Sequence, residues 1–435
     1  MTTSSDISEH EATDGTSAAA HEEQRSAGHP FAWVITLFGT AVGAGILFLP
    51  MDAGSFGFWP LLAGTIVIAP LVFYAHRMFS RVISASPVPG KDVLEIVSQF
   101  MGKTPGTVVA IAYWMAIYPV VLIYAISVTN TVDSFVVNQL NGPDLNRWLL
   151  SIICVGVLTG AFALGRRPML WLSNALVYPL IIALAATSIY LIPLWDFNSF
   201  YSSTEFSVWP FIKGLFLIMP VLIFSFAHEA AISQFSLDMQ KRHGVAAEKY
   251  VSRVGRITAA MLVFFTMFFV WSCVLAMGKD GITDAAEQNI PVLSYFANIT
   301  GTQFMAYISP LVVMCAIISS YFGHMLGTEE GTKYLFRRIA PETAKKFNDR
   351  QINVMTYLFV FITAVIVSVV NPSVLELISI VGGIFVALTV YIMPLLLFRK
   401  HERYEQFRGI WSNYFVFGAG ILIIITTVLD LFSLA

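Results

Sequence analysis

The stretch FAWVITLFGTAVGAGILFLP, residues 31–50, carries the pattern that decides the fold. It is apolar over about 20 residues, the length that an α-helix needs to cross a bilayer. Three glycines, Gly39, Gly43 and Gly45, lie in its middle, and Pro50 closes it. This arrangement predicts a membrane helix that is interrupted halfway. Close packing of Gly39 and Gly43 against another helix is the alternative interpretation.

A second apolar stretch shares this character. PFIKGLFLIMPVLIFSFAHEAAISQF, residues 210–235, contains Pro220, and places His228 and Glu229 near bilayer depth. It lies five spans after the first, so the two cross in opposite directions, and such a pair marks a transporter's binding site. A broken helix exposes backbone groups that are costly in lipid unless they face a cavity and a ligand. Half-helix N-termini suit a carboxylate and half-helix C-termini suit a cation, so an amino acid zwitterion matches both.

The composition agrees with a membrane protein. Of 435 residues 57% are apolar and 12% are charged, against about 25% charged in soluble proteins. The mean hydropathy is +0.73. These values exclude a soluble enzyme, a nucleic-acid binder and a disordered scaffold. Cys154, Cys273 and Cys315 are widely spaced and lack a C-x-x-C pattern, which predicts neither a disulfide framework nor a zinc site.

Long apolar runs fill the chain from Phe31 onward. We expect eleven transmembrane helices, at about 31–50, 56–79, 105–138, 148–165, 169–194, 209–235, 254–278, 303–328, 352–371, 373–398 and 411–433.

The charges predict the orientation of these helices. Residues 1–30 carry six acids and one arginine among small polar residues, a composition typical of a disordered tail. If this tail is cytoplasmic, all but three of the 25 Lys and Arg residues fall on the cytoplasmic side, the exceptions being Arg147, Lys213 and Lys279. The positive-inside rule therefore predicts a cytoplasmic N-terminus and an outside C-terminus.

Several motifs occur in a fixed order along the chain. They are GTAVGAGILFLPMDAG at 39–54, AHR at Ala75–Arg77, VTNT at Val128–Thr131, QNIPVLSYFAN at 288–298, FGHMLGTEEG at 322–331 and NPSVLELI at 371–378. In these motifs the chain resembles the hydroxy and aromatic amino acid permease (HAAAP) family, and within it the serine and threonine permeases. That family is related to the amino acid–polyamine–organocation superfamily.

The resemblance implies a fold and a function. The fold is an all-α integral membrane protein with a LeuT-like 5+5 inverted repeat, in which helices 1 and 6 are broken. Repeat one covers about 31–194, repeat two about 209–398, and an extra helix 411–433. The implied function is cation-coupled symport of serine- or threonine-type amino acids into the cell across a bacterial inner membrane. Spans 1, 2, 6 and 7 then move as a bundle against a scaffold of spans 3, 4, 8 and 9.

By the same resemblance, the substrate-binding residues lie at the two breaks. Backbone N–H groups of Ala44 and Gly45 hold the substrate carboxylate. Carbonyls from Phe224 to Ala227 hold its ammonium, and the hydroxyls of Thr40 and Ser225 bind a substrate hydroxyl.

The chain departs from the serine permeases at the sixth-helix break. They carry Asn-His-Ser or a similar run, whereas Ala227, His228 and Glu229 stand here. An acid within the membrane is a functional candidate, so Glu229 binds the ammonium or carries a coupled proton. The alternative is a structural carboxylate paired with His228 or facing the vestibule. His228 either has a role in binding the substrate or the proton, or its side chain supports the broken segment of the helix.

A second departure lies in the eighth span. Many serine and threonine permeases have Lys-Ser where this chain has Ser319-Ser320. The two serines follow Ala316 by three and four residues, so all three lie on one face of the helix. Sodium-coupled LeuT-like transporters use a carbonyl and two hydroxyls at this spacing, with two first-span carbonyls that map to Gly39 and Val42. The resemblance to the family implies protons, whereas these five residues favour Na⁺. Serines that bond back to their own helix are the alternative.

The expected partners are a small amino acid, a coupling cation and the lipid bilayer, without nucleic acid. No enzyme activity or cofactor is expected, and the oligomeric state stays open. One alternative is an aromatic amino acid permease of the same family, and another is a sensor that binds an amino acid without transporting it. His324 and Asn130 match family motifs without an assigned role. Glu376 follows Pro372 as a solvated helix-start carboxylate or lines the outer mouth.

Overall fold

The computed structural model describes residues 30–161, 166–202 and 206–432, so the tail predicted at 1–30 lies outside them apart from Pro30. All regular structure in these ranges is helical. The long helices are α2 (Pro30–Ala41), α3 (Ala44–Ser55), α4 (Phe58–Ser84), α6 (Lys103–Ser134), α7 (Arg147–Gly160), α8 (Arg166–Leu191), α10 (Val208–Ser225), α11 (Glu229–His243), α12 (Ala247–Glu287), α14 (Gln303–Ile339), α16 (Asp349–Val370) and α20 (Trp411–Leu431). Another long helix, Val374–Lys400, is made up of α17 (Val374–Ile380), η5 (Val381–Ile392) and α18 (Met393–Lys400). Shorter helices are α5 (Val93–Met101), η1 (Phe135–Gln139), α9 (Phe197–Ser202), α13 (Val292–Ile299), α15 (Pro341–Ala344) and α19 (Glu405–Arg408).

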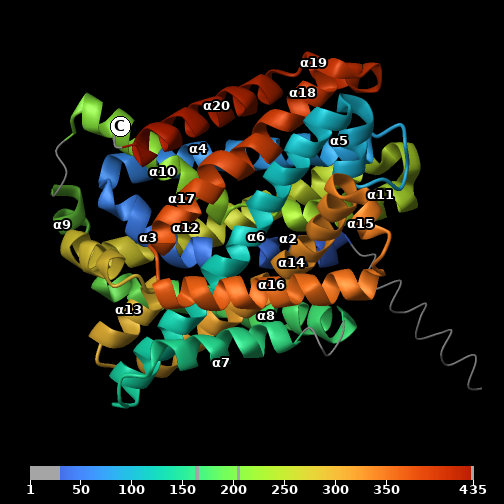
Figure 1. Cartoon of the computed structure of the whole chain (residues 1–435). Coiled ribbons are helices and arrows are strands. Elements are labelled where there is room, and N and C mark those ends of the chain that lie inside the picture. The colour runs from blue at the N-terminus through green and yellow to red at the C-terminus, as the bar shows by residue number, and fades with distance from the viewer. Residues whose placement is uncertain (1–29, 162–165, 203–205, 433–435) are drawn as a thin grey trace, which may run out of the picture.

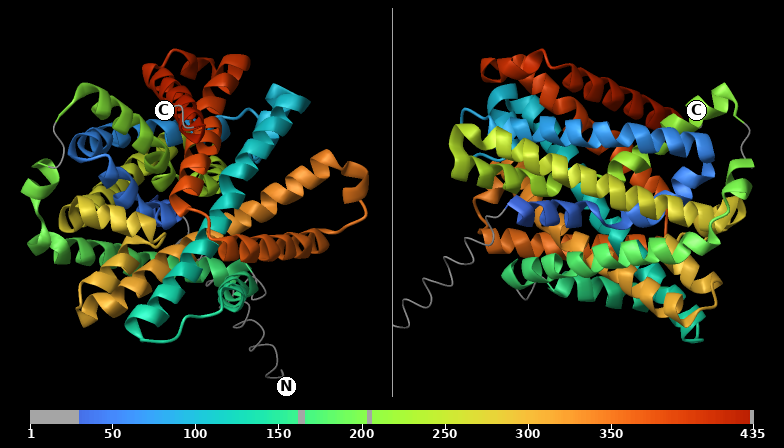
Figure 2. Two further views of the ribbon diagram at one scale, coloured as in Figure 1. Left: turned by 60° about the vertical axis from the view of Figure 1, so that its left-hand side comes forward. Right: turned by 180° about the vertical axis from the view of Figure 1, so that it is seen from behind.

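The long helices lie side by side as one bundle (Figure 1). Helices α9 and α13 lie at one end of it, and α5, α15 and α19 lie at the other. Helix α2 runs through the middle of the bundle when it is seen from behind (Figure 2). Nearly every residue of α3 is buried, whereas outer positions such as Ile66, Trp209 and Val370 are exposed and apolar. An apolar exterior of this extent suits lipid.

The membrane-crossing helices agree in part with the eleven runs. Nine helices in the described ranges are long and apolar enough to cross a bilayer, and the bent pair α2 and α3 makes up to ten. Helix α7, where the fourth run was expected, has only 14 residues. The all-helical membrane architecture is therefore confirmed, and α7 is the element on which the count of eleven depends.

Both predicted interruptions exist, but the prolines do not make them. Helices α2 and α3 meet at an angle of 56°, with Gly43 between them in a non-helical conformation. Pro50 was expected to close the first span, yet it lies inside α3, which continues to Ser55. The second span likewise passes through Pro220 and is broken only after Ser225. A proline removes a single N–H bond, and a helix buried against its neighbours tolerates that loss.

At the end of the bundle that carries α13, three asparagines form a polar network. Asn130 of α6 donates to the carbonyl of Asn289 (2.7 Å) and to the side chain of Asn371 (3.0 Å). Arg147, at the start of α7, donates to the Asn130 side-chain oxygen at 2.5 Å. Asn289 donates to Asn371 and to the carbonyl of Pro372, both at 3.0 Å. Asn289 and Asn371 have φ of 52° and 54°, which asparagine tolerates better than most residues.

We expect Asn289→Ala to destabilise the fold. The substitution leaves the Pro372 carbonyl, the Val374 amide and the Asn371 side chain each short of a partner. At about 1 kcal/mol for each lost hydrogen bond, the thermal midpoint of the purified protein should fall by a few degrees. Asn138→Ala is the matched control, because Asn138 is exposed and bonds only to Ser134 one turn away. Equal midpoints for the two variants would contradict the role of the network.

Candidate functional site

The two interruptions contact each other in the interior. A Cβ atom added at Gly45, near the start of α3, would lie 2.8 Å from the Cα of Ser225 and 2.8 Å from the ring of Phe224. A Cβ at Gly43 would lie 2.5 Å from the Tyr124 hydroxyl and 2.9 Å from the Ser320 hydroxyl. The first break is therefore held between the end of α10 on one side and α6 and α14 on the other, at distances that only glycine allows.

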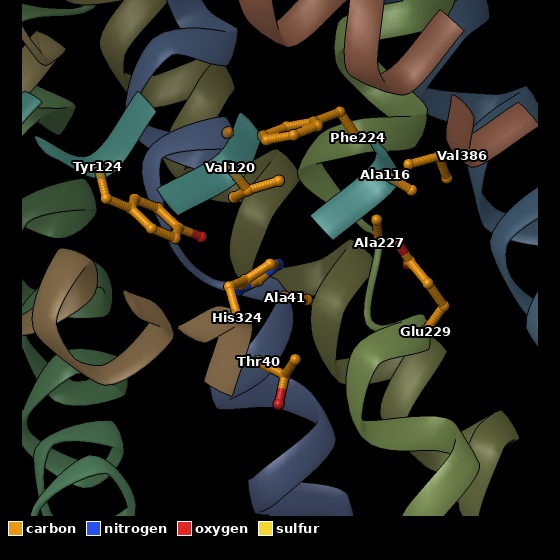
Figure 3. A pocket seen from close by; sticks show the side chains of 11 residues that line it. Thr40, Ala41, Ala116, Val120, Tyr124, Phe224, Ala227, Glu229, His324 and Val386 are labelled. Carbon is orange, nitrogen blue, oxygen red and sulfur yellow. The ribbon is translucent and has the colours of Figure 1, made fainter. Parts of the chain in front are cut away.

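A small cavity of about 10 Å³, room for roughly one water molecule, lies where these segments meet (Figure 3). Its wall is mainly apolar, with a small number of polar groups pointing inward. Tyr124 and His324 approach from one side, and Glu229 approaches from the other (Figure 3). The lining residues are Thr40, Ala41, Gly45, Ala116, Val120, Tyr124, Phe224, Ala227, Glu229, His324 and Val386. An apolar pocket with a few convergent polar groups is the usual form of a small-molecule site.

Hydrogen bonds from α14 hold the first break in place. The Ser320 hydroxyl donates to the carbonyl of Thr40 at 3.0 Å and lies 2.7 Å from the Tyr124 hydroxyl. His324 Nδ1 bonds to the carbonyl of Ser320, one turn earlier, at 2.9 Å. The Thr40 hydroxyl donates to Thr36 of its own helix. The bond from Ser320 satisfies the carbonyl of Thr40 beside the break, as the membrane interior requires.

Glu229 is the charged residue of the cavity. Its side chain is 3% exposed, and its Oε2 atom has no hydrogen-bond partner among the described residues. Neither lysine nor arginine is among the residues that line the cavity. A buried carboxylate without a cation is costly, so this group takes a proton or a cationic ligand. It stands at the first position of α11, where the helix dipole favours a negative charge.

The structure brings five of the predicted substrate residues to the cavity. They are Thr40, Gly45, Phe224, Ala227 and Glu229. Three others lie beside it without lining it, namely Ala44, Ser225 and His228.

The side chains of these neighbours are engaged elsewhere. The Ser225 hydroxyl is buried and donates to the carbonyl of Val221 at 2.7 Å. His228 bonds through Nδ1 to the carbonyl of Phe226 at 2.9 Å, and its ring stacks on His76. Its contacts therefore support the backbone of the break.

Among the residues predicted on α14 for a cation, Ser320 forms a hydrogen bond that reaches the first break. The Ser319 hydroxyl donates to the carbonyl of Ala316 at 3.1 Å, the back-bonding that was the alternative interpretation. Ser320 instead reaches across to Thr40, so α14 does contribute oxygen atoms at the break. Gly39 packs tightly, since a Cβ there would lie 2.2 Å from a methyl carbon of Val177. Val42 directly follows α2, with its amide donating to the carbonyl of Phe38.

Six lining residues were not predicted as site residues. Ala116, Val120 and Tyr124 recur every four residues on α6, so they share one helix face. That spacing is visible in the sequence, but an apolar helix offers many such faces. Ala41, His324 and Val386 complete the set, and His324 had been noted only as part of a motif.

Two other candidates lie away from the cavity. Glu376 is in the first turn of α17, where Ser373 caps the helix, as expected of a helix-start carboxylate. Asn130 belongs to the polar network near α13. A wider hollow of about 450 Å³ between α5, α14 and the start of α16 is open and lined mainly by charged residues. Several of those charges pair with one another or with neighbours, as Arg337 does with Asp349 and Lys333 with Glu329.

Known proteins resemble this chain over nearly its whole length. A family described as amino acid permease matches residues 30–433. The serine transporter SdaC of Escherichia coli strain K12 is 34% identical over 430 residues, covering 97% of this chain and 100% of that protein. The threonine/serine transporter TdcC of Escherichia fergusonii is 31% identical over 421 residues, covering 92% of this chain and 95% of that protein. The crystal structure of MhsT in complex with L-phenylalanine has a TM-score of 0.62 at 12% identity, covering 94% of this chain and 99% of that one. The similarity to MhsT establishes the overall fold of this chain.

We expect Gly43→Ala to destabilise the protein by about 1–3 kcal/mol, the usual cost of overpacking. The added methyl group must displace the Tyr124 and Ser320 hydroxyls, which hold the break. Gly418→Ala is the control, because nothing lies within 4 Å of the new methyl on α20. Alanine also favours a helix more than glycine does, so the control should unfold at an unchanged or higher temperature. Thermal unfolding followed by tryptophan fluorescence measures both variants, and a neutral Gly43→Ala would contradict the close approach.

Proposed function

The chain belongs to the amino acid permease family, and from this premise we propose that it is a secondary active symporter for serine, threonine or a close relative. The observation that carries the proposal is the cavity at the meeting of two broken helices, with a buried carboxylate in its wall. Its relatives are named as transporters, so the chain is a permease and not an enzyme.

The ends of the broken helices suit the two charges of an amino acid. The start of α3 turns backbone N–H groups toward the break, and the positive end of its dipole favours the substrate carboxylate. The end of α10 supplies the carbonyls of residues 224–227, which favour the ammonium. Glu229 adds a carboxylate oxygen without a hydrogen-bond partner in the described part of the chain, which strengthens the preference for a cationic group.

The size of the cavity favours a small substrate. In this conformation it measures about 10 Å³, room for roughly one water molecule, so it must widen to admit a small amino acid and widen further for an aromatic one. Val120, Val386 and Phe224 form an apolar part of its wall. This wall supports serine or threonine over the aromatic alternative, in which a large ring would have to enter the same space.

Two coupling cations are candidates, Na⁺ and a proton, and different residues would bind each of them. Na⁺ prefers oxygen ligands, and the Ser320 hydroxyl lies at the first break, bonded to the carbonyl of Thr40. The carbonyls of Gly39, Val42 and Ala316 would complete the proposed set of ligands. A proton would be carried by Glu229, which has no cationic partner among the described residues that line the cavity. The Ser319 hydroxyl, bonded to Ala316, would have to turn to bind sodium.

The membrane arrangement completes the proposal. With α7 as a short span, the chain crosses a bacterial inner membrane eleven times, the N-terminus being cytoplasmic by the charge rule. Repeat one then covers about 31–194, repeat two about 209–398, and α20 is the extra helix. Transport proceeds by alternating access of spans 1, 2, 6 and 7 against spans 3, 4, 8 and 9. A sensor would bind the amino acid without accumulating it.

Uptake of radiolabelled L-serine into proteoliposomes under separate sodium and proton gradients tests the function and the ion. Accumulation driven by sodium should fall at least tenfold in the Ser319→Ala/Ser320→Ala double variant. Accumulation driven only by protons should fall as far in Glu229→Gln. Ser309→Ala is the control, because among the described residues the hydroxyl of this buried α14 serine bonds only to the sulfur of Met305, at 3.9 Å. If neither gradient drives serine uptake, the symport proposal is wrong.

Ala116→Leu should raise the KM for threonine more than the KM for serine, by about fivefold or more. The added carbons fill the cavity beside Val386, and each buried methylene clashes or displaces ligand. Val108→Leu, on the exposed face of the same helix, should leave both KM values unchanged. In the unmodified protein, excess tryptophan or tyrosine should not compete with serine, whereas strong competition would favour the aromatic alternative.

A further inference from the structure

The proposed function leaves one buried group beside the site unused, the imidazole of His76. It lies in the middle of α4 and is 4% exposed. Its ring stacks on that of His228, with the centroids 3.8 Å apart and the planes 8° from parallel. His76 does not line the cavity, although His228 stands between the lining residues Ala227 and Glu229.

Two hydrogen bonds fix both ring nitrogens of His76. Its Nδ1 atom lies 2.9 Å from the carbonyl of Val72, and a carbonyl only accepts, so Nδ1 carries the hydrogen. Its Nε2 atom lies 3.3 Å from the backbone N–H of His228, which donates to it. Nε2 therefore presents a lone pair, and the ring is neutral.

The backbone N–H group that donates to His76 belongs to the second break. Residues 226–228 lie between α10 and α11, where backbone groups lose their helical partners. The His228 amide turns to α4 for its hydrogen bond. The His228 ring in turn donates from Nδ1 to the carbonyl of Phe226 at 2.9 Å. Together, the two stacked imidazoles satisfy one donor and one acceptor of the broken segment.

We propose that His76 is a positioning residue of the amino acid site, whose neutral imidazole holds the second break in its binding shape. The inference rests on the proposed function, since it assigns a role toward that substrate. The backbone of His228 sets where Ala227 and Glu229 stand in the cavity wall. If the His228 amide loses its acceptor, the break moves to find another partner, and the groups that face the ammonium move with it.

Two substitutions separate hydrogen bonding from packing. His76→Gln places an amide oxygen near the position of Nε2, so it keeps an acceptor for the His228 amide. His76→Leu fills a similar space and offers none. Ser80→Ala is the control, because Ser80 is buried on the same helix and bonds only to the backbone carbonyl of His76.

The test uses the full chain in lipid nanodiscs and in proteoliposomes. In substrate-free protein, hydrogen–deuterium exchange of the peptide at residues 226–232 should speed up by about tenfold in His76→Leu, because an unpaired buried amide is costly. Exchange should stay near the unmodified rate in His76→Gln and Ser80→Ala. In proteoliposomes, His76→Leu should raise the KM for L-serine by about tenfold at a similar maximal rate, and His76→Gln should restore it within about threefold.

Two results would overturn the proposal. One is His76→Leu with unchanged exchange and unchanged KM, which would leave the ring a packing role. The other is His76→Gln as impaired as His76→Leu, which would make the ring itself, and not its acceptor, the requirement. If the unmodified protein fails to transport serine, the proposed substrate is wrong, yet the exchange rates still decide whether His76 holds the break.

Discussion

The structure depends on the rule that backbone groups freed by a broken helix must find partners inside the protein, because lipid offers none. The first break meets this rule through α14 and α6, where Ser320 donates to Thr40 and bonds to Tyr124. The second meets it through His76 and His228. Gly43 and Gly45 let these partners approach to distances that a side chain would forbid.

The same rule shapes the site that lies between the breaks. Once the neighbours have satisfied part of each broken segment, the groups left over face the small cavity between the breaks. Among them are the start of α3, the end of α10 and the unpaired oxygen of Glu229. In the proposed site a zwitterion would supply both missing charges at once, so ligand binding would complete the satisfaction of groups that the fold alone leaves unpaired. In this way the cost of breaking two helices becomes a preference for an amino acid.

The sequence predicts the broken spans well but their details poorly. Composition and the glycines at 39–45 were enough for an all-helical membrane fold with an interruption in the first span, and Glu229 stood out because acids are rare at bilayer depth. The exact break points were not predictable from Pro50 and Pro220, since burial keeps both within continuous helices. Ala116, Val120 and Val386 were not predicted as lining residues, because in a sequence an apolar residue that faces a cavity cannot be told from one that faces lipid. Ser225 is the opposite case, since it was predicted to contact the substrate. Its hydroxyl instead donates to the carbonyl of Val221, and this depends on a side-chain rotamer that the sequence does not reveal.

The distribution of side-chain contacts fits the proposed division into bundle and scaffold. Trp33 of α2 donates to Asp238 of α11 at 2.9 Å, and Arg81 of α4 pairs with Glu248 of α12, so both contacts lie within the proposed bundle. The asparagine network instead joins α6, α7 and the start of α17 to the segment after α12. The bond from Ser320 to Thr40 is different, since it connects a scaffold helix to the broken bundle helix beside the cavity. If the two units move against each other, this contact must stretch or exchange partners. A cation bound there would replace it with stronger ion–oxygen contacts, and the Thr40 carbonyl would couple ion binding to the substrate site.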